Sequence, residues 1–247
     1  MIYLVIIVTV CYVLMQFIET VSFSSRIAGK LTKSLALGTT LQLSIFTMSR
    51  LFLPPLLVAM SYMIESELSI QLFLMIAFII TILAFISSLL VLFNLNSFQS
   101  LFQKLFFFYQ SGSIPIAIIK VLTRKEGLKH RVNLEYRPKL KHLSFKKVTA
   151  SCFSYFFLST GFLIAFSLAI IIPEYRMTMS QLTTAFHGIG AVFLAMYIDP
   201  MMSRSLDVEL KNNHWVDNIY SILVGRVLSY LIASLVFLGL YLFALLT

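Results

Sequence analysis

Long apolar stretches separated by short polar segments dominate the chain, and they determine its predicted architecture. An α-helix needs about 20 consecutive apolar residues to cross the hydrocarbon core of a bilayer. Six stretches reach this length, at residues 2–23, 35–64, 68–95, 149–172, 177–202 and 216–246. The pattern therefore predicts an all-α, polytopic membrane protein with about six transmembrane helices, in which residues 1–247 form a single transmembrane domain.

Composition agrees with this assignment. Hydrophobic residues make up 59% of the chain and charged residues 12%, whereas an ordinary soluble domain has about 25% charged residues. The first stretch has no basic residue before it and no small-residue cleavage site after it, so we expect a retained helix and not a signal peptide. Cys11 and Cys152 both fall inside apolar stretches, where isolated cysteines are typically packing residues.

The positive charge is concentrated in the segment 96–147. This segment contains eleven Lys and Arg residues and two acidic residues, Glu126 and Glu135, which accounts for the whole formal net charge of +9. Lys and Arg are enriched in the cytoplasmic loops of membrane proteins. We therefore predict that this loop is cytoplasmic and that both termini lie on the outer side.

The basic loop also contains apolar helical patterns. LFQKLFFFYQ (101–110) and IAIIKVL (116–122) predict short interfacial helices on the inner leaflet. The basic strip that follows would attract anionic lipid headgroups. An ordinary positive-inside loop without a further role is the alternative, and nucleic acid is not an expected partner because no folded soluble domain accompanies the strip.

The stretch SIFTMSRLFLPPLLVAM (44–60) places an arginine deep in an apolar span. Arg50 lies about 22 Å into the second span at helical rise. A charge at the bilayer centre costs at least about 2.5 kcal/mol, and arginine cannot lose its proton. Pro54 and Pro55 remove the helical partners of the carbonyls of Arg50 and Leu51, which predicts a break in the helix. Broken helices at membrane depth line cavities.

Other charges fall inside or at the ends of spans. Arg226 lies at a depth similar to that of Arg50 in the last span, while Glu19 and Arg26 are seven residues apart near the inner end of the first. Asp199 is near the inner end of the fifth span. For Glu19, Arg26 and Asp199, simple interfacial charges are the alternative interpretation.

Three arginines and two acids leave one positive charge in excess. We expect a polar chamber that opens to the cytoplasm, with the acids at its mouth and the two deep arginines unneutralised above them. The planar donor fork of arginine suits phosphate and diphosphate oxygens. His187 is the only histidine inside a span, and it is either a proton relay or a side chain hydrogen-bonded to a neighbouring helix.

Motifs typical of enzymes are missing. The chain has no HExxH pair, no Gly-x-Ser-x-Gly elbow, no Asp-rich motif and no phosphate-binding glycine loop. We therefore predict neither an enzyme nor a protein with a metal or another cofactor.

The segments FIETVSFSSRIAGK (17–30), MSR (48–50) and YIDP (197–200) resemble the Amj family, the alternate lipid II flippases of bacteria. The resemblance implies an inner-membrane protein that moves lipid II, the undecaprenyl-diphosphate-linked peptidoglycan precursor, from the inner to the outer leaflet.

Together with this resemblance, the buried charges lead to a hypothesis. Arg50 and Arg226 would hold the diphosphate, Arg26 would recruit it at the inner mouth, and Glu19 and Asp199 would balance the charge or act as gates. The kinked second span would move during alternating access. A transporter for another amphiphilic or organic anion and a non-transporting membrane scaffold are the alternatives, and the energy source and oligomeric state stay open.

Overall fold

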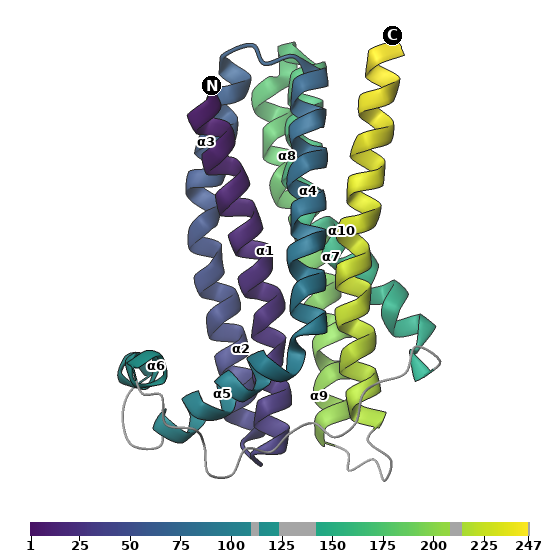
Figure 1. The fold of residues 1–247 in the computed structure, drawn as a ribbon. Helices are drawn as coiled ribbons and strands as arrows, with labels where there is room; N and C mark the ends of the chain where they lie inside the picture. Colours follow the sequence, from purple (N-terminus) through teal and green to yellow (C-terminus); the bar gives the residue numbers. More distant parts are fainter. Residues whose placement is uncertain (110–113, 124–141, 208–213, 247) are drawn as a thin grey trace.

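The computed structural model describes residues 1–109, 114–123, 142–207 and 214–246, and nearly all of them are helical (Figure 1). Six helical stretches are long and apolar enough to cross a membrane. This confirms the predicted fold class. Four of the stretches are uninterrupted helices: α1 (Ile2–Leu31), α4 (Ile70–Phe93), α7 (Phe145–Ile171) and α10 (His214–Leu246).

The other two spans change helix type along their length. The second consists of α2 (Leu35–Ser49), a 3-10 turn η1 (Arg50–Phe52) and α3 (Leu53–Glu65). The fifth consists of a 3-10 turn η3 (Pro173–Tyr175), α8 (Arg176–Phe193), a π-helical segment η4 (Leu194–Ile198) and α9 (Asp199–Asp207). Both interruptions lie beside charged side chains of the candidate site.

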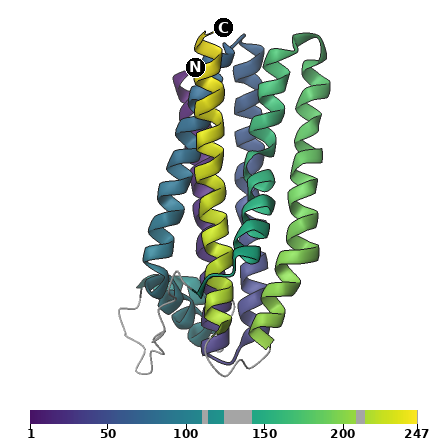
Figure 2. The ribbon, with the colours of Figure 1, turned by 90° about the vertical axis from the view of Figure 1, so that its right-hand side faces the viewer.

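Two shorter helices, α5 (Leu95–Tyr109) and α6 (Ile114–Thr123), lie at one end of the bundle, where α5 runs across its base (Figure 1). We call this the loop end; both termini lie at the opposite end, the terminal end (Figures 1 and 2). The two predicted short helices are thus present. Most of the basic strip, residues 124–141, lies outside the described residues.

The long helices pack as an open ring. Along it, α2 and α3 pack against α1, then α1 against α4, α4 against α10, α10 against α7, and α7 against α8. Among the described residues, α8 has no comparable packing against α2 or α3, which would close the ring. Over Arg176–Phe193 of α8, only Gly190 is buried. The helices α2 and α8 therefore do not pack closely against each other, and we call the interval between them the lateral opening.

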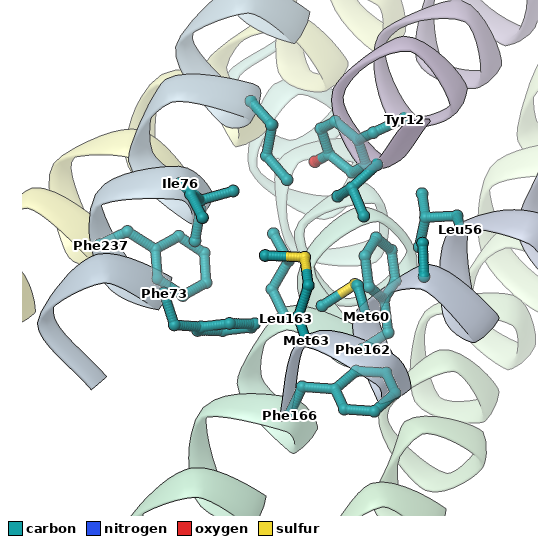
Figure 3. Close-up of a cluster of buried hydrophobic side chains, with 14 of the residues drawn as sticks. Tyr12, Leu56, Met60, Met63, Phe73, Ile76, Phe162, Leu163, Phe166 and Phe237 are labelled. Carbon is teal, nitrogen blue, oxygen red and sulfur yellow. The ribbon is translucent and has the colours of Figure 1, made fainter. Parts of the chain in front are cut away.

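Three apolar clusters form the interior, and the third packs α5 and α6 against α1 and α2. The first joins α1, α3, α4, α7 and α10, and includes Tyr12, Met60, Phe73, Phe162 and Phe237 (Figure 3). The second lies nearer the loop end.

The second apolar cluster includes Phe23 of α1, Tyr155 of α7 and Leu223 of α10. Along α1, Glu19 lies between Met15 of the first cluster and Phe23 of the second. Glu19 therefore lies between these two apolar clusters, whereas Arg26 and Asp199 lie next to Ile27 and Ile198 of the second.

A glycine pair brings α1 and α2 together near the loop end. A Cβ on Gly38 would lie 2.7 Å from the carbonyl oxygen of Ser25 and 3.0 Å from the Cα of Gly29. The Ser25 hydroxyl donates a 2.8 Å hydrogen bond to the Gly38 carbonyl. Small residues permit such close approach between membrane helices, so this pair sets how α2 is placed against α1.

We expect Gly38→Ala to destabilise the protein by about 1–3 kcal/mol, because the added methyl overpacks a contact made of backbone atoms. Gly188→Ala is the matched control, since a Cβ there would meet nothing within 4 Å and alanine is the better helix former by about 1 kcal/mol. Thermal unfolding in detergent measures both. Equal melting temperatures for the two variants would contradict the proposed close packing.

Candidate functional site

The carboxylate of Glu19 is the centre of a buried network that joins three helices. Its Oε2 accepts a 2.7 Å hydrogen bond from Nη2 of Arg226 on α10. Its Oε1 accepts a 3.1 Å hydrogen bond from the Ser49 hydroxyl and lies 3.3 Å from Nη2 of Arg50. Glu19 is only 2% exposed. One carboxylate therefore holds two guanidinium groups from different spans.

Arg226 is fully buried, and its polar partners come from two helices. Its Nε donates to the Tyr230 hydroxyl at 2.8 Å, and its Nη2 also reaches Oε1 of Gln16 at 3.2 Å. The Tyr230 hydroxyl in turn donates to the same Gln16 oxygen at 2.7 Å. The guanidinium carbon lies 4.4 Å from the centre of the Tyr155 ring, a cation–π contact that strengthens where water is excluded. Nη1 of Arg226 has no hydrogen-bond partner.

Arg50 differs from Arg226 because it is partly accessible. Its side chain is 21% exposed and its guanidinium carbon lies 4.6 Å from the centre of the Phe46 ring. The residue begins the 3-10 turn that separates α2 from α3. Pro54 and Pro55 follow directly, and a proline offers no N–H to the carbonyl four residues before it. Arg50 is thus the accessible cation of the network.

A second ion pair lies closer to the loop end. Nη2 of Arg26 on α1 is 2.9 Å from Oδ1 of Asp199 on α9, and their side chains are 1% and 28% exposed. Nε and Nη1 of Arg26 have no hydrogen-bond partner although they are buried. Pro200 deprives the carbonyl of Met196 of its α-helical donor, and the chain is π-helical over Leu194–Ile198. Such π-segments are frequent at functional sites.

His187 lies on α8, next to the lateral opening. Its side chain is partly exposed, it is within electrostatic range of Arg50 and Glu19, and it shares a hydrogen bond with the backbone of Leu158 on α7. The hydrogen bond agrees with the structural interpretation of this histidine. Its role as a proton relay stays a prediction.

Polar side chains also lie on the exposed surfaces of α2 and α8. A surface cavity of about 450 Å³ on α2 is lined by Thr40, Ser44 and Thr47 among others. On α8, Gln181 and Thr184 are exposed. Hydroxyl and amide groups are therefore exposed on both helices.

The structure brings together Glu19, Arg50 and Arg226 and pairs Arg26 with Asp199, but the predicted chamber needs correction. We expected the acids at the mouth and both deep arginines unneutralised, and this is wrong for Glu19 and Arg226. The reason is that the Glu19 carboxylate lies at the level of Arg50 and Arg226 and forms ion pairs with both. Glu19 lies about three turns before the end of α1, which continues to Leu31.

Several partners in the network were missed by sequence analysis. Gln16, Ser49, Tyr155 and Tyr230 are all buried and surround the charged groups. Helical spacing could have indicated two of them, because Gln16 lies three residues before Glu19 and Tyr230 four residues after Arg226. Within the described part of the chain, no group of three or more His, Cys, Asp or Glu side chains is placed to hold a metal ion.

We expect Glu19→Gln to lower the free energy of unfolding by about 3–5 kcal/mol, because it leaves the Arg226 charge buried without a counterion. Asp199→Asn is the matched control, and we expect a smaller loss because Asp199 is 28% exposed. Chemical unfolding in mixed micelles compares the two. A greater loss in Asp199→Asn would contradict the central position of Glu19.

Comparison with known proteins gives one family. The family model described as Amj, Alternate to MurJ, matches residues 11–243. Neither the curated proteins nor the solved structures gave a match to the chain.

Proposed function

Because the chain belongs to the Amj (Alternate to MurJ) family, we propose that the Glu19 network and the lateral opening form the path along which the substrate headgroup crosses the membrane. Membership of this family implies a lipid II flippase role and a multi-pass bacterial membrane protein, a transporter and not an enzyme. Such a protein must shield a charged and sugar-bearing headgroup from hydrocarbon while the lipid tail stays in the bilayer.

The proposed headgroup path rests mainly on the partial exposure of Arg50. The ion pair between Arg50 and Glu19 is longer than that between Arg226 and Glu19, 3.3 Å against 2.7 Å, and the Arg50 side chain is the more accessible. A diphosphate offers more negative charge than one carboxylate and can accept two parallel hydrogen bonds from a guanidinium group. The diphosphate therefore replaces Glu19 at Arg50, so that Glu19 occupies the anion site while the path is empty.

The surplus charge supports an anionic ligand. Arg26, Arg50 and Arg226 face only Glu19 and Asp199 in the two networks, which leaves one positive charge. Arg26 has two unused donors and, at the loop end, receives the headgroup first. Arg226 is fully buried, so it contributes its unused Nη1 donor only after Glu19 has been displaced.

The lateral opening suits a lipid substrate. Polar side chains on α2 and α8 can hydrogen-bond the uncharged sugar groups. They are those of Thr40, Ser44 and Thr47 on α2 and of Gln181 and Thr184 on α8. The polyprenyl chain remains outside, in hydrocarbon, because α8 and α2 do not close on each other. The interrupted second span, at Arg50–Phe52, is the element that moves during alternating access.

The loop end faces the cytoplasm in this proposal. Described basic residues at that end include Lys30, Lys33, Lys104 and Lys120, whereas Glu65, Glu67 and Glu174 lie at or near the turns of the terminal end, together with Arg176. Cytoplasmic loops are enriched in Lys and Arg. The helices α5 and α6 and the basic strip then lie near the inner leaflet and attract its anionic lipids.

We expect Arg50→Gln to reduce lipid II exposure on the outer leaflet at least tenfold in a bacterial host depleted of its own lipid II flippase, because the accessible cation is lost. Arg204→Gln, which removes an exposed arginine on α9, is the matched control and is expected to transport normally. Protein abundance is measured in parallel. Full rescue by Arg50→Gln at equal abundance would contradict the mechanism. Failure of the unaltered chain to rescue would instead point to a different anionic substrate.

The orientation has its own test. In a variant with Cys11 and Cys152 replaced by serine, we expect Ser66→Cys at the terminal end to react with a membrane-impermeant maleimide in intact spheroplasts. Thr32→Cys at the loop end is expected to react only after the membrane is opened. The reverse pattern would show that the positive-inside assignment is wrong.

A further inference from the structure

A cavity at the terminal end lies apart from the Glu19 network. It has a volume of about 310 Å³, and its lining includes Ser61 and Glu65 of α3, Phe166 of α7, and Arg176 and Ser180 of α8. It is therefore the place where the second and fifth spans come to line one common space. Phe166 also belongs to the first apolar cluster (Figure 3), so the inner wall of the cavity is part of a rigid core.

The two charged residues of this cavity form no ion pair with each other, and Glu65 is exposed whereas Arg176 is partly buried. No ion pair joins Glu65 or Arg176 to any other described residue. Nε of Arg176 is buried and has no hydrogen-bond partner. A buried donor without a partner costs free energy of the order of 1–3 kcal/mol, which a ligand that accepts its hydrogen bond would recover.

The separation of opposite charges defines the ligand chemistry. A guanidinium group binds a phosphate or carboxylate, and a carboxylate across the same cavity binds an ammonium group. The hydroxyls of Ser61 and Ser180 add neutral hydrogen-bonding groups between them. Ligand pockets commonly have volumes of about 300–1,000 Å³, so this cavity holds a small polar group and not a whole lipid.

We propose that the cavity lined by Glu65 and Arg176 is a binding site for a zwitterionic group that combines a phosphate or carboxylate with a primary ammonium. Arg176 binds the anionic part and Glu65 the ammonium. Two sources share this chemistry: the headgroup of an amino-bearing phospholipid, and an amino-acid segment of the substrate headgroup that reaches the terminal end. The binding step needs neither Arg50 nor the Glu19 network, so it can be tested independently of flipping.

The test is ligand binding to the full-length protein in detergent, followed by thermal unfolding. Dihexanoyl phosphatidylethanolamine and the dipeptide alanyl-alanine are the two zwitterionic probes. Dihexanoyl phosphatidylglycerol lacks the ammonium group and is the control ligand. We expect at least one zwitterionic probe to raise the melting temperature at concentrations tenfold below those that phosphatidylglycerol needs. Which of the two probes binds identifies the source.

Arg176→Gln and Glu65→Gln are each expected to weaken binding of that probe at least tenfold, whereas Arg50→Gln is expected to bind it normally. The conservative variants Arg176→Lys and Glu65→Asp keep the charges and are expected to retain binding, which controls for folding. Equal binding of phosphatidylglycerol, or unchanged binding in both Gln variants, would overturn the proposal. If Arg50→Gln loses flipping but still binds the zwitterionic probe, the result supports a binding site that is separate from the Glu19 network.

Discussion

A single carboxylate shared by two arginines organises the centre of this protein. Glu19 of α1 contacts Arg226 of α10 at 2.7 Å and Arg50 of η1 at 3.3 Å, in a layer between two apolar clusters. Arg226 is fully buried at this level, and a charge in hydrocarbon is costly. The first, second and last spans must therefore meet at this level, and their relative heights follow from the ion pairs.

In the proposed mechanism, the same carboxylate links stability to transport. A buried ion pair seldom adds net stability compared with apolar residues of similar volume, so packing alone does not explain why the chain contains it. The Glu19 carboxylate stabilises Arg50 while the path is empty. An anion with more negative charge, such as a diphosphate, can then displace this carboxylate from Arg50. Because the ring of helices is open between α8 and the second span, the displacing anion can arrive while it is still attached to a lipid tail.

Much of the fold follows from hydrophobic patterning, whereas the pairing within the site does not. The six spans, the short helices of the basic loop and the change of helix type before Pro54 and Pro55 are visible in the sequence, because apolar run length and proline act locally. The partnership of Glu19 with Arg226 joins residues at opposite ends of the chain and depends on the relative height of two helices. From the sequence we placed Glu19 at the mouth of the chamber, and only the contacts show that its carboxylate lies between Arg50 and Arg226.

The open ring also escaped prediction. Both α2 and α8 have enough apolar residues to appear as ordinary spans, and only the contacts show that α8 packs against α7 and not against α2. The cavity that contains Arg176 was missed for a related reason. Glu65 ends α3 and Arg176 begins α8, next to turns that resemble simple interfacial loops. Their place in one cavity depends on how α3, α7 and α8 converge.

The most direct test of the central claim is the affinity of the purified protein for a short prenyl diphosphate, compared between the unaltered chain and Glu19→Gln. If the diphosphate and the Glu19 carboxylate compete for Arg50, the variant binds the diphosphate more tightly, and adding Arg50→Gln abolishes the gain. If Glu19 merely supports the fold, the folded variant binds with unchanged or lower affinity, and that result would contradict the exchange of anions at Arg50.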